Sequence, residues 1–254
     1  MIIDYLASIG NFAFRYISHS DPVSVIQLMD EEDIDFALVS SLESIMYRNV
    51  QKGNELLAER IGEHRDRLIP AAVINPIYPE AVEDTLYCLE DLGMKAIRLY
   101  PNYHGYDLTD SRIASVMSVA QERTIPVSIA FRVEDERQRH WLVNPQPASV
   151  DTVLSLIKAF PEVHFVLERA SGGELNRLIR GAPEIKNWSA ETSGRFLSDL
   201  RQVLDAIGSD RLILGTDMPL QYSKAAILKL ESLDLDRASR EKIMMLNAAR
   251  LLKL

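Results

Sequence analysis

The sequence predicts an α/β fold, a single (β/α)8 TIM barrel that spans residues 1–254. Eight short runs of apolar or β-branched residues recur along the chain, and each is followed by a segment with apolar residues at helical spacing. This regular alternation favours a parallel barrel with helices outside it. The composition does not shift and no linker interrupts the chain, so we expect one closed domain.

The expected strands are short and separated by turn signals such as Pro22, Gly53 and Pro79. In chain order they are Ile2–Ala7, Phe36–Ser41, Leu68–Asn75, Ala96–Tyr100, Pro126–Arg132, His164–Arg169, Ile185–Ala190 and Leu212–Thr216. An open doubly wound sheet is the alternative fold. It needs a glycine-rich phosphate-binding turn after the first strand, and this chain has only Gly10 there.

Amphipathic segments lie between the expected strands and after the last one. The expected helices are Val23–Met29, Asn54–His64, Glu80–Leu92, Arg112–Arg123, Val150–Phe160, Leu175–Ile179, Phe196–Ile207, Lys224–Leu233 and Arg240–Leu252. In the last of them, apolar residues recur mostly at spacings of three and four, which indicates a buried helix face.

The charge balance and cysteine content exclude several classes of protein. Lys and Arg number 28 against 37 Asp and Glu, giving a net charge of -9, so we expect neither nucleic acid nor an anionic membrane as a partner. Cys88 is the one cysteine, which excludes an internal disulfide and a cysteine-based metal site. With no signal-peptide pattern and no long apolar stretch, we expect a cytoplasmic protein. The sequence leaves a homo-oligomer open.

Arginines stand at the ends of three expected strands: Arg98, Arg132 and Arg169. Active sites of TIM barrels collect at the C-terminal mouth, the end of the barrel at which the strands finish. Arginine binds carboxylate or phosphate through two parallel hydrogen bonds, so this pattern predicts an anionic small-molecule substrate. Four further polar residues near strand ends are candidate substrate-binding residues: Tyr100, Asn102, Arg137 and Glu191.

Three residues are candidates for moving protons. Asp217 ends the expected eighth strand in a Gly-Thr-Asp-Met-Pro run, which directs a carboxylate into the mouth. His104 lies between two tyrosines in the loop after the fourth strand, and His140 lies in the loop after the fifth. We expect Asp217 to act as a general base and one of the histidines as an acid. Each of the three has a structural alternative, such as helix capping for Asp217.

Several segments together resemble a known family. Leu212–Leu220 (LILGTDMPL) and Arg240–Leu254 (REKIMMLNAARLLKL) look like the eighth strand and closing helix of the amidohydrolase-related proteins, the second branch of the amidohydrolase superfamily. Gly93–Asp107 resembles the fourth-strand segment of the same proteins, and the order of segments agrees over nearly the whole chain. The resemblance implies a TIM barrel of the metal-dependent hydrolase type.

The chain departs from the pattern of the metal-dependent members. These carry two histidines at the end of the first strand, where this chain has Leu6 and Ser8. The strand-5 histidine position falls on Ala130 and the strand-6 position on or near Arg169, so Asp217 alone remains of the usual ligands. Zinc sites need three or four suitable donors, so we expect no metal cofactor. Gly10–Arg15 resembles a pattern of a subgroup that also lacks the paired histidines.

Three functions follow as hypotheses. The first is a hydrolase, or a related acyl-transfer or isomerisation enzyme, acting on a small carboxylated substrate such as a lactone without the usual divalent metal. The second is a hydrolase or decarboxylase with zinc or another metal in a shifted site made from Asp217, His104, His140 and Glu191. The third is a non-catalytic barrel that binds an anionic small ligand.

Overall fold

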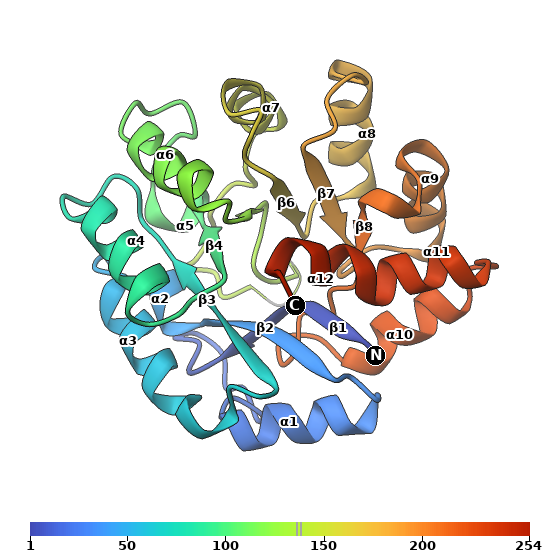
Figure 1. Cartoon of the computed structure of the whole chain (residues 1–254), viewed down its shortest axis with the longest axis horizontal. Helices are drawn as coiled ribbons and strands as arrows, with labels where there is room; N and C mark the ends of the chain where they lie inside the picture. Colours follow the sequence, from blue (N-terminus) through green and yellow to red (C-terminus); the bar gives the residue numbers. More distant parts are fainter. Residues whose placement is uncertain (136, 138) are drawn as a thin grey trace.

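The computed structural model describes residues 1–135, 137 and 139–254. Eight parallel strands follow one another in chain order around a barrel, and a ring of helices surrounds them (Figure 1). The strands are β1 (Ile3–Ile9), β2 (Phe36–Ser41), β3 (Leu68–Val73), β4 (Ala96–Leu99), β5 (Val127–Ala130), β6 (Phe165–Glu168), β7 (Trp188–Glu191) and β8 (Leu212–Ile213). The predicted TIM barrel is confirmed.

Every expected helix has a counterpart. The helices are α1 (Pro22–Glu31), α2 (Glu43–Met46), α3 (Gln51–Arg60), η1 (Gly62–His64), α4 (Ala81–Glu90), α5 (Pro101–His104), α6 (Ile113–Arg123), α7 (Val150–Ala159), α8 (Gly172–Gly181), α9 (Leu197–Ile207), η3 (Ser209–Arg211), α10 (Ser223–Glu231), α11 (Arg237–Glu241), η4 (Lys242–Leu246) and α12 (Asn247–Leu252). The four-residue helices α2 and α5 were not predicted, because one turn is too short to show a period. None of the helices in the described part of the chain is long and apolar enough to cross a membrane.

The eighth strand is shorter than predicted and ends at Ile213. The backbone N–H of Gly215 donates to Thr192 Oγ1 at 3.1 Å, and that of Thr216 donates to Asp4 Oδ1 at 2.9 Å. Because these donors bond to side chains, the ladder between β7 and β8 stops two residues after it begins.

The seventh strand begins at Trp188, three residues later than predicted. The side-chain amide of Asn187 donates to three carbonyls, that of Ile157 in α7 and those of Phe160 and Val163 in the connection to β6. This anchor fixes Asn187 in the connection before the strand.

Three backbone hydrogen bonds close the barrel between β1 and the segment that follows β8, and in one of them the N–H of Ser8 donates to the carbonyl of Met218 at 2.9 Å. The N–H of Tyr5 donates to the carbonyl of Leu214 at 2.8 Å. The N–H of Asp217 donates to the carbonyl of Leu6 at 2.7 Å. The hydrogen bond from Asp217 to Leu6 ties the backbone of Asp217 directly to the first strand.

Asp4 reinforces this closure from inside β1. Its buried carboxylate accepts hydrogen bonds from the N–H of Leu6 at 3.0 Å, the N–H of Thr216 at 2.9 Å and the hydroxyl of Thr216 at 2.5 Å. Burial raises the pKa of Asp4 to about 7, although these hydrogen bonds oppose the rise. Asp4 therefore fixes the residue that precedes Asp217.

The core has three hydrophobic clusters, one of which contributes Ile45, Tyr100 and Leu220 to the C-terminal mouth. The largest cluster fills the space between strands and outer helices, as expected for a TIM barrel. A second cluster fills the N-terminal end of the barrel, where α12 lies across the opening (Figure 1). Ligands therefore have access from the opposite, C-terminal mouth. The second cluster consists of Ile3, Tyr5, Leu38, Ile69, Ala71, Ala96, Val166, Ile213, Ala248 and Leu252.

Arg98 lies inside the barrel and is fully buried. Its Nη1 donates to the carbonyl of Ala7 at 2.8 Å and to Ser40 Oγ at 2.7 Å, and its Nη2 donates to the carbonyls of Tyr5 and Leu38 at 2.7 and 3.1 Å. Its Nε lies 3.1 Å from Glu168 Oε1. All three nitrogens are thus engaged with β1, β2 and β6. The structure places this predicted substrate-binding residue as a cross-link between strands, below the mouth.

Replacing Arg98 by methionine tests this role. The Arg98→Met variant leaves the Glu168 carboxylate buried without its cation, so we expect the free energy of unfolding to fall by about 3–5 kcal/mol. Urea denaturation measures the change. The control is Arg123→Met, because Arg123 pairs with Glu90 on the exposed surface, where a pair contributes less than about 1 kcal/mol. Equal losses in the two variants would contradict the cross-link.

Candidate active site

A small cavity of about 10 Å³ lies at the C-terminal mouth of the barrel. That volume is enough for about one water molecule. We call it the mouth cavity, and its walls come from the ends of β1, β4, β5 and β6 with the loops beyond them, from α2 and from the segment after β8. Its lining residues are Leu6, Ser8, Ile45, Tyr100, Ala130, Arg132, Val133, Glu168, Arg169, Asp217 and Leu220.

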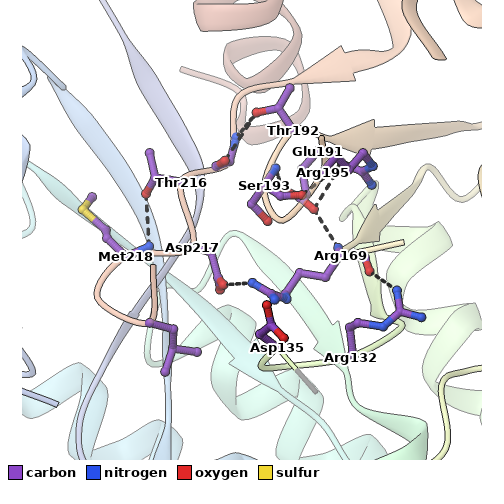
Figure 2. A network of polar contacts seen from close by, with 12 residues as sticks. Arg132, Asp135, Arg169, Glu191, Thr192, Ser193, Arg195, Thr216, Asp217 and Met218 are labelled. Carbon is purple, nitrogen blue, oxygen red and sulfur yellow. Dashed lines mark hydrogen bonds and ion pairs between the residues drawn. The ribbon is translucent and has the colours of Figure 1, made fainter. Parts of the chain in front are cut away.

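Asp217 is buried at the edge of this cavity and has a left-handed backbone, with φ of 63°. Its carboxylate forms an ion pair with the guanidinium of Arg169 (Figure 2). Burial raises the pKa of Asp217, Arg169 opposes the rise, and the nearby carboxylates of Glu191 and Glu168 add to it, so that the resulting pKa is about 7. Asp217 can therefore exchange a proton near neutral pH.

Arg169 follows β6 and also has a positive φ, 52°. Its backbone N–H donates to Glu191 Oε1 at 2.6 Å, so the fully buried Glu191 fixes the backbone from which the guanidinium extends. The second carboxylate oxygen accepts the N–H of Ser193 at 2.5 Å. Gly215 leaves the room that Glu191 needs, because a Cβ there would lie 2.5 Å from Glu191 Oε2. Glu191 thus positions Arg169 from behind.

Arg132 lies on the other side of Arg169. Its Nη1 donates to the carbonyl of Arg169 at 2.6 Å, and the two Nη atoms bind Glu174 at 2.9 and 2.7 Å in a two-pronged ion pair. Glu174 also accepts from the N–H of Ser171 at 2.7 Å and thereby caps α8. The arginine, the helix terminus and the Arg169 backbone therefore form one connected unit.

A larger cavity of about 620 Å³ opens beside the mouth cavity and shares Arg132 and Arg169 with it. We call it the outer cavity. Substrates larger than water have room here while still reaching the two arginines. It is lined by Arg132, Asp135, Arg137, Arg169, Ser171, Ser193, Gly194, Arg195, Phe196, Thr216, Gln221, Tyr222, Ala225, Ala226 and Lys229.

The structure brings together five of the predicted site residues in or behind the mouth cavity. Asp217, Arg169, Arg132 and Tyr100 line it, and Glu191 lies behind Arg169. Burial raises the pKa of the Tyr100 phenol, so this side chain stays neutral. The predicted Arg137 lines the outer cavity, where its guanidinium pairs with Asp135 at 2.6 Å.

Three other predicted residues lie outside both cavities. His104 Nε2 donates to the carbonyl of Ser44 at 3.1 Å, and burial lowers the pKa of this histidine. Its ring joins the loops after β2 and β4. His140 stacks on Phe14 with ring centroids 5.2 Å apart. Asn102 donates to the carbonyl of Phe131 at 3.0 Å.

Two cationic residues of the outer cavity were not predicted. Arg195 lies four residues beyond the end of β7, so the rule used for the other strand ends, applied a few residues further, would have found it. Lys229 lies near the end of α10. Its sequence neighbourhood shows an ordinary amphipathic helix, and only the folded chain brings it to the cavity.

The chain belongs to the amidohydrolase family, whose family model matches residues 35–254. The predicted relationship to the amidohydrolase superfamily is therefore confirmed. The TIM barrel hosts many reactions, so membership defines the fold and the end of the barrel at which chemistry occurs.

Solved structures of the same fold cover essentially the whole chain. A protein described as an amidohydrolase from Staphylococcus aureus has a TM-score of 0.78 at 18% identity, with 100% of this chain and 99% of that chain covered. 2,6-dihydroxybenzoate decarboxylase from Rhizobium has a TM-score of 0.74 at 18% identity, with 99% of this chain and 98% of that chain covered. Dihydroxybenzoic acid decarboxylase from Polaromonas was solved with bound manganese and 2-nitroresorcinol. It has a TM-score of 0.77 at 18% identity, with 100% of this chain and 97% of that chain covered. Identity this low establishes the fold and leaves the reaction open.

The expectation of no metal cofactor is wrong for proteins of this fold. The Polaromonas decarboxylase and 5-carboxyvanillate decarboxylase from Novosphingobium aromaticivorans both contain bound manganese, which points to a divalent metal. The absence of histidines at the positions of the usual metal ligands is therefore not sufficient to exclude a metal.

The described residues nevertheless do not show where a metal would bind. Among residues 1–135, 137 and 139–254, no group of three or more His, Cys, Asp and Glu side chains is arranged to hold an ion. At the mouth, the Asp217 carboxylate is paired with Arg169, and Leu6 and Ala130 offer no donor. The side chains there do not fit a metal in this arrangement, and the predicted shifted site is not assembled. We assign no chemical step to a metal.

The raised pKa of Asp217 gives a testable dependence of stability on pH. An aspartate whose pKa is about 7 in the folded chain and 3.8 ordinarily binds its proton more tightly when folded, so its contribution to stability is lost as pH rises through 7. We expect the free energy of unfolding of the wild type, relative to Asp217→Asn, to fall by on the order of 1 kcal/mol or more between about pH 5 and 8.

Urea denaturation of both proteins at several pH values measures this difference, and the comparison cancels groups that titrate equally in the two. Asp4→Asn serves as a second test, since the pKa of Asp4 is raised to about 7 for the same reason. A difference that is independent of pH would show that the Asp217 carboxyl keeps an ordinary pKa.

Proposed function

We propose that the protein is an enzyme that acts on a small carboxylated substrate at the C-terminal mouth, with Asp217 transferring the proton and Arg169 and Arg132 binding the substrate. The observation that carries the proposal is the buried Asp217–Arg169 pair, in which a carboxyl with a pKa of about 7 lies against a guanidinium. A titratable acid and a fixed cation at this end of a TIM barrel are typical of an active site.

Arg169 has capacity left for a substrate. Its Nη1 is paired with Asp217, while its Nε has no hydrogen-bond partner among the described residues. The Nε–Nη2 edge of a guanidinium matches the two oxygens of a carboxylate. A substrate bound along this edge would lie beside Asp217, which is the geometry that proton transfer requires.

Hydrolysis of a lactone is the first candidate reaction. Asp217 in its ionised form would remove a proton from a water molecule in the mouth cavity, which has room for one. The water oxygen would then bond to the lactone carbonyl carbon. The ring C–O bond breaks, and the leaving oxygen takes the proton back from Asp217. Arg169 would stabilise the negative charge that develops on the carbonyl oxygen.

Decarboxylation of an aromatic acid is the second candidate, and the raised pKa of Asp217 specifically favours it. A carboxyl that is partly protonated near neutral pH can donate a proton to the ring carbon. The electron pair of the bond to the carboxylate then returns to the ring as carbon dioxide leaves, and water reprotonates Asp217. Two of the similar structures described above are decarboxylases of dihydroxybenzoic acids, and this likeness of fold adds support.

A substrate panel separates the two candidates. Purified protein is incubated with carboxylated lactones and with hydroxybenzoic acids, each with and without added manganese. Ring opening is monitored through the release of protons. Decarboxylation is monitored through the loss of the acid, measured by chromatography. Recovery of every compound unchanged, with binding retained, would favour the non-catalytic barrel and contradict the proposal.

With a substrate identified, Asp217→Asn tests the assignment of the proton. The amide keeps the size of the side chain but cannot exchange the proton, so we expect kcat to fall by about 10²–10⁴-fold. The control is His140→Gln, because His140 lies outside both cavities and should leave kcat within about twofold. Unchanged turnover in Asp217→Asn, or an equal loss in His140→Gln, would remove the proposed role.

A further inference from the structure

The outer cavity lies where TIM barrels often bind phosphate. Its walls come from the loops after β5, β6, β7 and β8 and from α10. In many TIM barrels a phosphate site is formed by the loops after strands 7 and 8 together with a helix N-terminus. Whether the outer cavity can bind an anion depends on the charges and the unpaired hydrogen-bond donors of its wall.

The wall of the outer cavity is strongly cationic. Among the described residues that line it, five side chains are basic and only that of Asp135 is acidic. Three of the arginines have carboxylate partners close by: Arg132 with Glu174, Arg137 with Asp135 and Arg169 with Asp217. The positive charges of the remaining two basic residues, Arg195 and Lys229, are less completely neutralised by nearby carboxylates.

Arg195 is buried and only loosely paired. The nearest carboxylate oxygen, Oε1 of Glu191, lies 3.6 Å from its Nη1, and the same oxygen already accepts the N–H of Arg169. Its Nε and Nη2 have no hydrogen-bond partner among the described residues. Donors of a buried guanidinium are normally satisfied, so these two are suited to a ligand.

Lys229 lies next to Arg195 and extends the same cationic surface. Its ammonium donates to the carbonyl of Arg195 at 3.2 Å, and no ion pair of Lys229 occurs in the described part of the chain. Burial lowers the pKa of Lys229. The carboxylate of Glu191 opposes this effect, and the charges of Arg195 and Arg169 add to it. The two adjacent cations therefore repel each other, and an anion bound between them would relieve the repulsion.

We propose that the outer cavity is a binding site for a phosphate group, held by the guanidinium of Arg195 and the ammonium of Lys229. A phosphate carries close to two negative charges near neutral pH and offers three acceptor oxygens, which suits two adjacent cations. The inference rests on the proposed function in one respect, the claim that the phosphate belongs to the substrate. Binding of the anion does not depend on it.

The remaining walls fit a phosphate ester better than a free ion. The cavity of about 620 Å³ is far larger than a phosphate requires. Phe196 and Tyr222 are 77% and 87% exposed at its edge, so an organic group would bury apolar surface there. The N-terminus of α10 has no side-chain cap, and Ala225 and Ala226 of its first turn face the cavity, which adds the favourable end of the helix dipole. We therefore expect a substrate with an organic body and a phosphate.

Calorimetric titration of the whole chain with inorganic phosphate, at constant ionic strength, tests the site. Lys229→Gln should weaken phosphate binding by about tenfold or more, because one charge-assisted contact is lost. Lys229→Arg should restore most of the affinity. The matched control is Lys224→Gln, since Lys224 lies on the same helix but outside the outer cavity, and it should bind phosphate like the wild type.

The outcomes separate this inference from the proposed function. Asp217→Asn should still bind phosphate, whatever happens to turnover, because Asp217 is not part of the phosphate site. The inference is overturned if the wild type does not bind phosphate, if Lys229→Gln binds it as well as the wild type while remaining folded by circular dichroism, or if benzoate binds more tightly than phosphate with the same dependence on Lys229. The last result would indicate a carboxylate site instead.

Discussion

The closure of the barrel between β1 and the segment after β8 is the constraint on which the candidate site depends. Asp4 binds Thr216 through both backbone and hydroxyl, and the next residue donates its N–H to the carbonyl of Leu6. Asp217 thereby acquires a left-handed backbone and a buried carboxylate. Such a backbone is unfavourable for a residue with a side chain and persists only where its surroundings fix it.

Arginine–carboxylate pairs continue outward from this closure in layers. Arg98 and Glu168 form the deepest pair, inside the barrel. Asp217 and Arg169 form the next, at the mouth, and Arg132 and Glu174 lie beyond them. A buried charge is costly without a partner, so in the two inner pairs each arginine and each carboxylate requires the other to stay in place. The order explains how several arginines can line a cavity in a protein with a net charge of -9.

The barrel was predictable because each of its signals is local. The strand-helix alternation is a property of neighbouring residues, and the strand Phe36–Ser41 was predicted to the residue. The end of β8 was not, because the donors of Gly215 and Thr216 bond to side chains more than 20 residues away. Short helices such as α5 were also missed, since one turn has no period.

The candidate site was predictable where a strand end alone decides the position. Asp217, Arg132 and Arg169 follow strand ends and reach the mouth cavity. Arg98 was misplaced because strand alternation tells which side chains point into the barrel but not how deep they lie. A histidine near a strand end is a common candidate for a catalytic residue, but His104 donates to the backbone carbonyl of Ser44. Lys229 depends on tertiary packing that no local pattern shows.

Asp217 exchanges its proton near neutral pH in this model of the site, and infrared difference spectroscopy detects the protonated carboxyl itself. Spectra of the wild type and of Asp217→Asn are recorded from about pH 5 to 9. We expect the wild type to show a carboxylic-acid signal that disappears with a midpoint near pH 7, and Asp217→Asn to lack the part of this signal that belongs to Asp217. Asp4→Asn identifies the part of the signal that belongs to Asp4, whose pKa is similar. An identical titration in the wild type and Asp217→Asn would contradict the account.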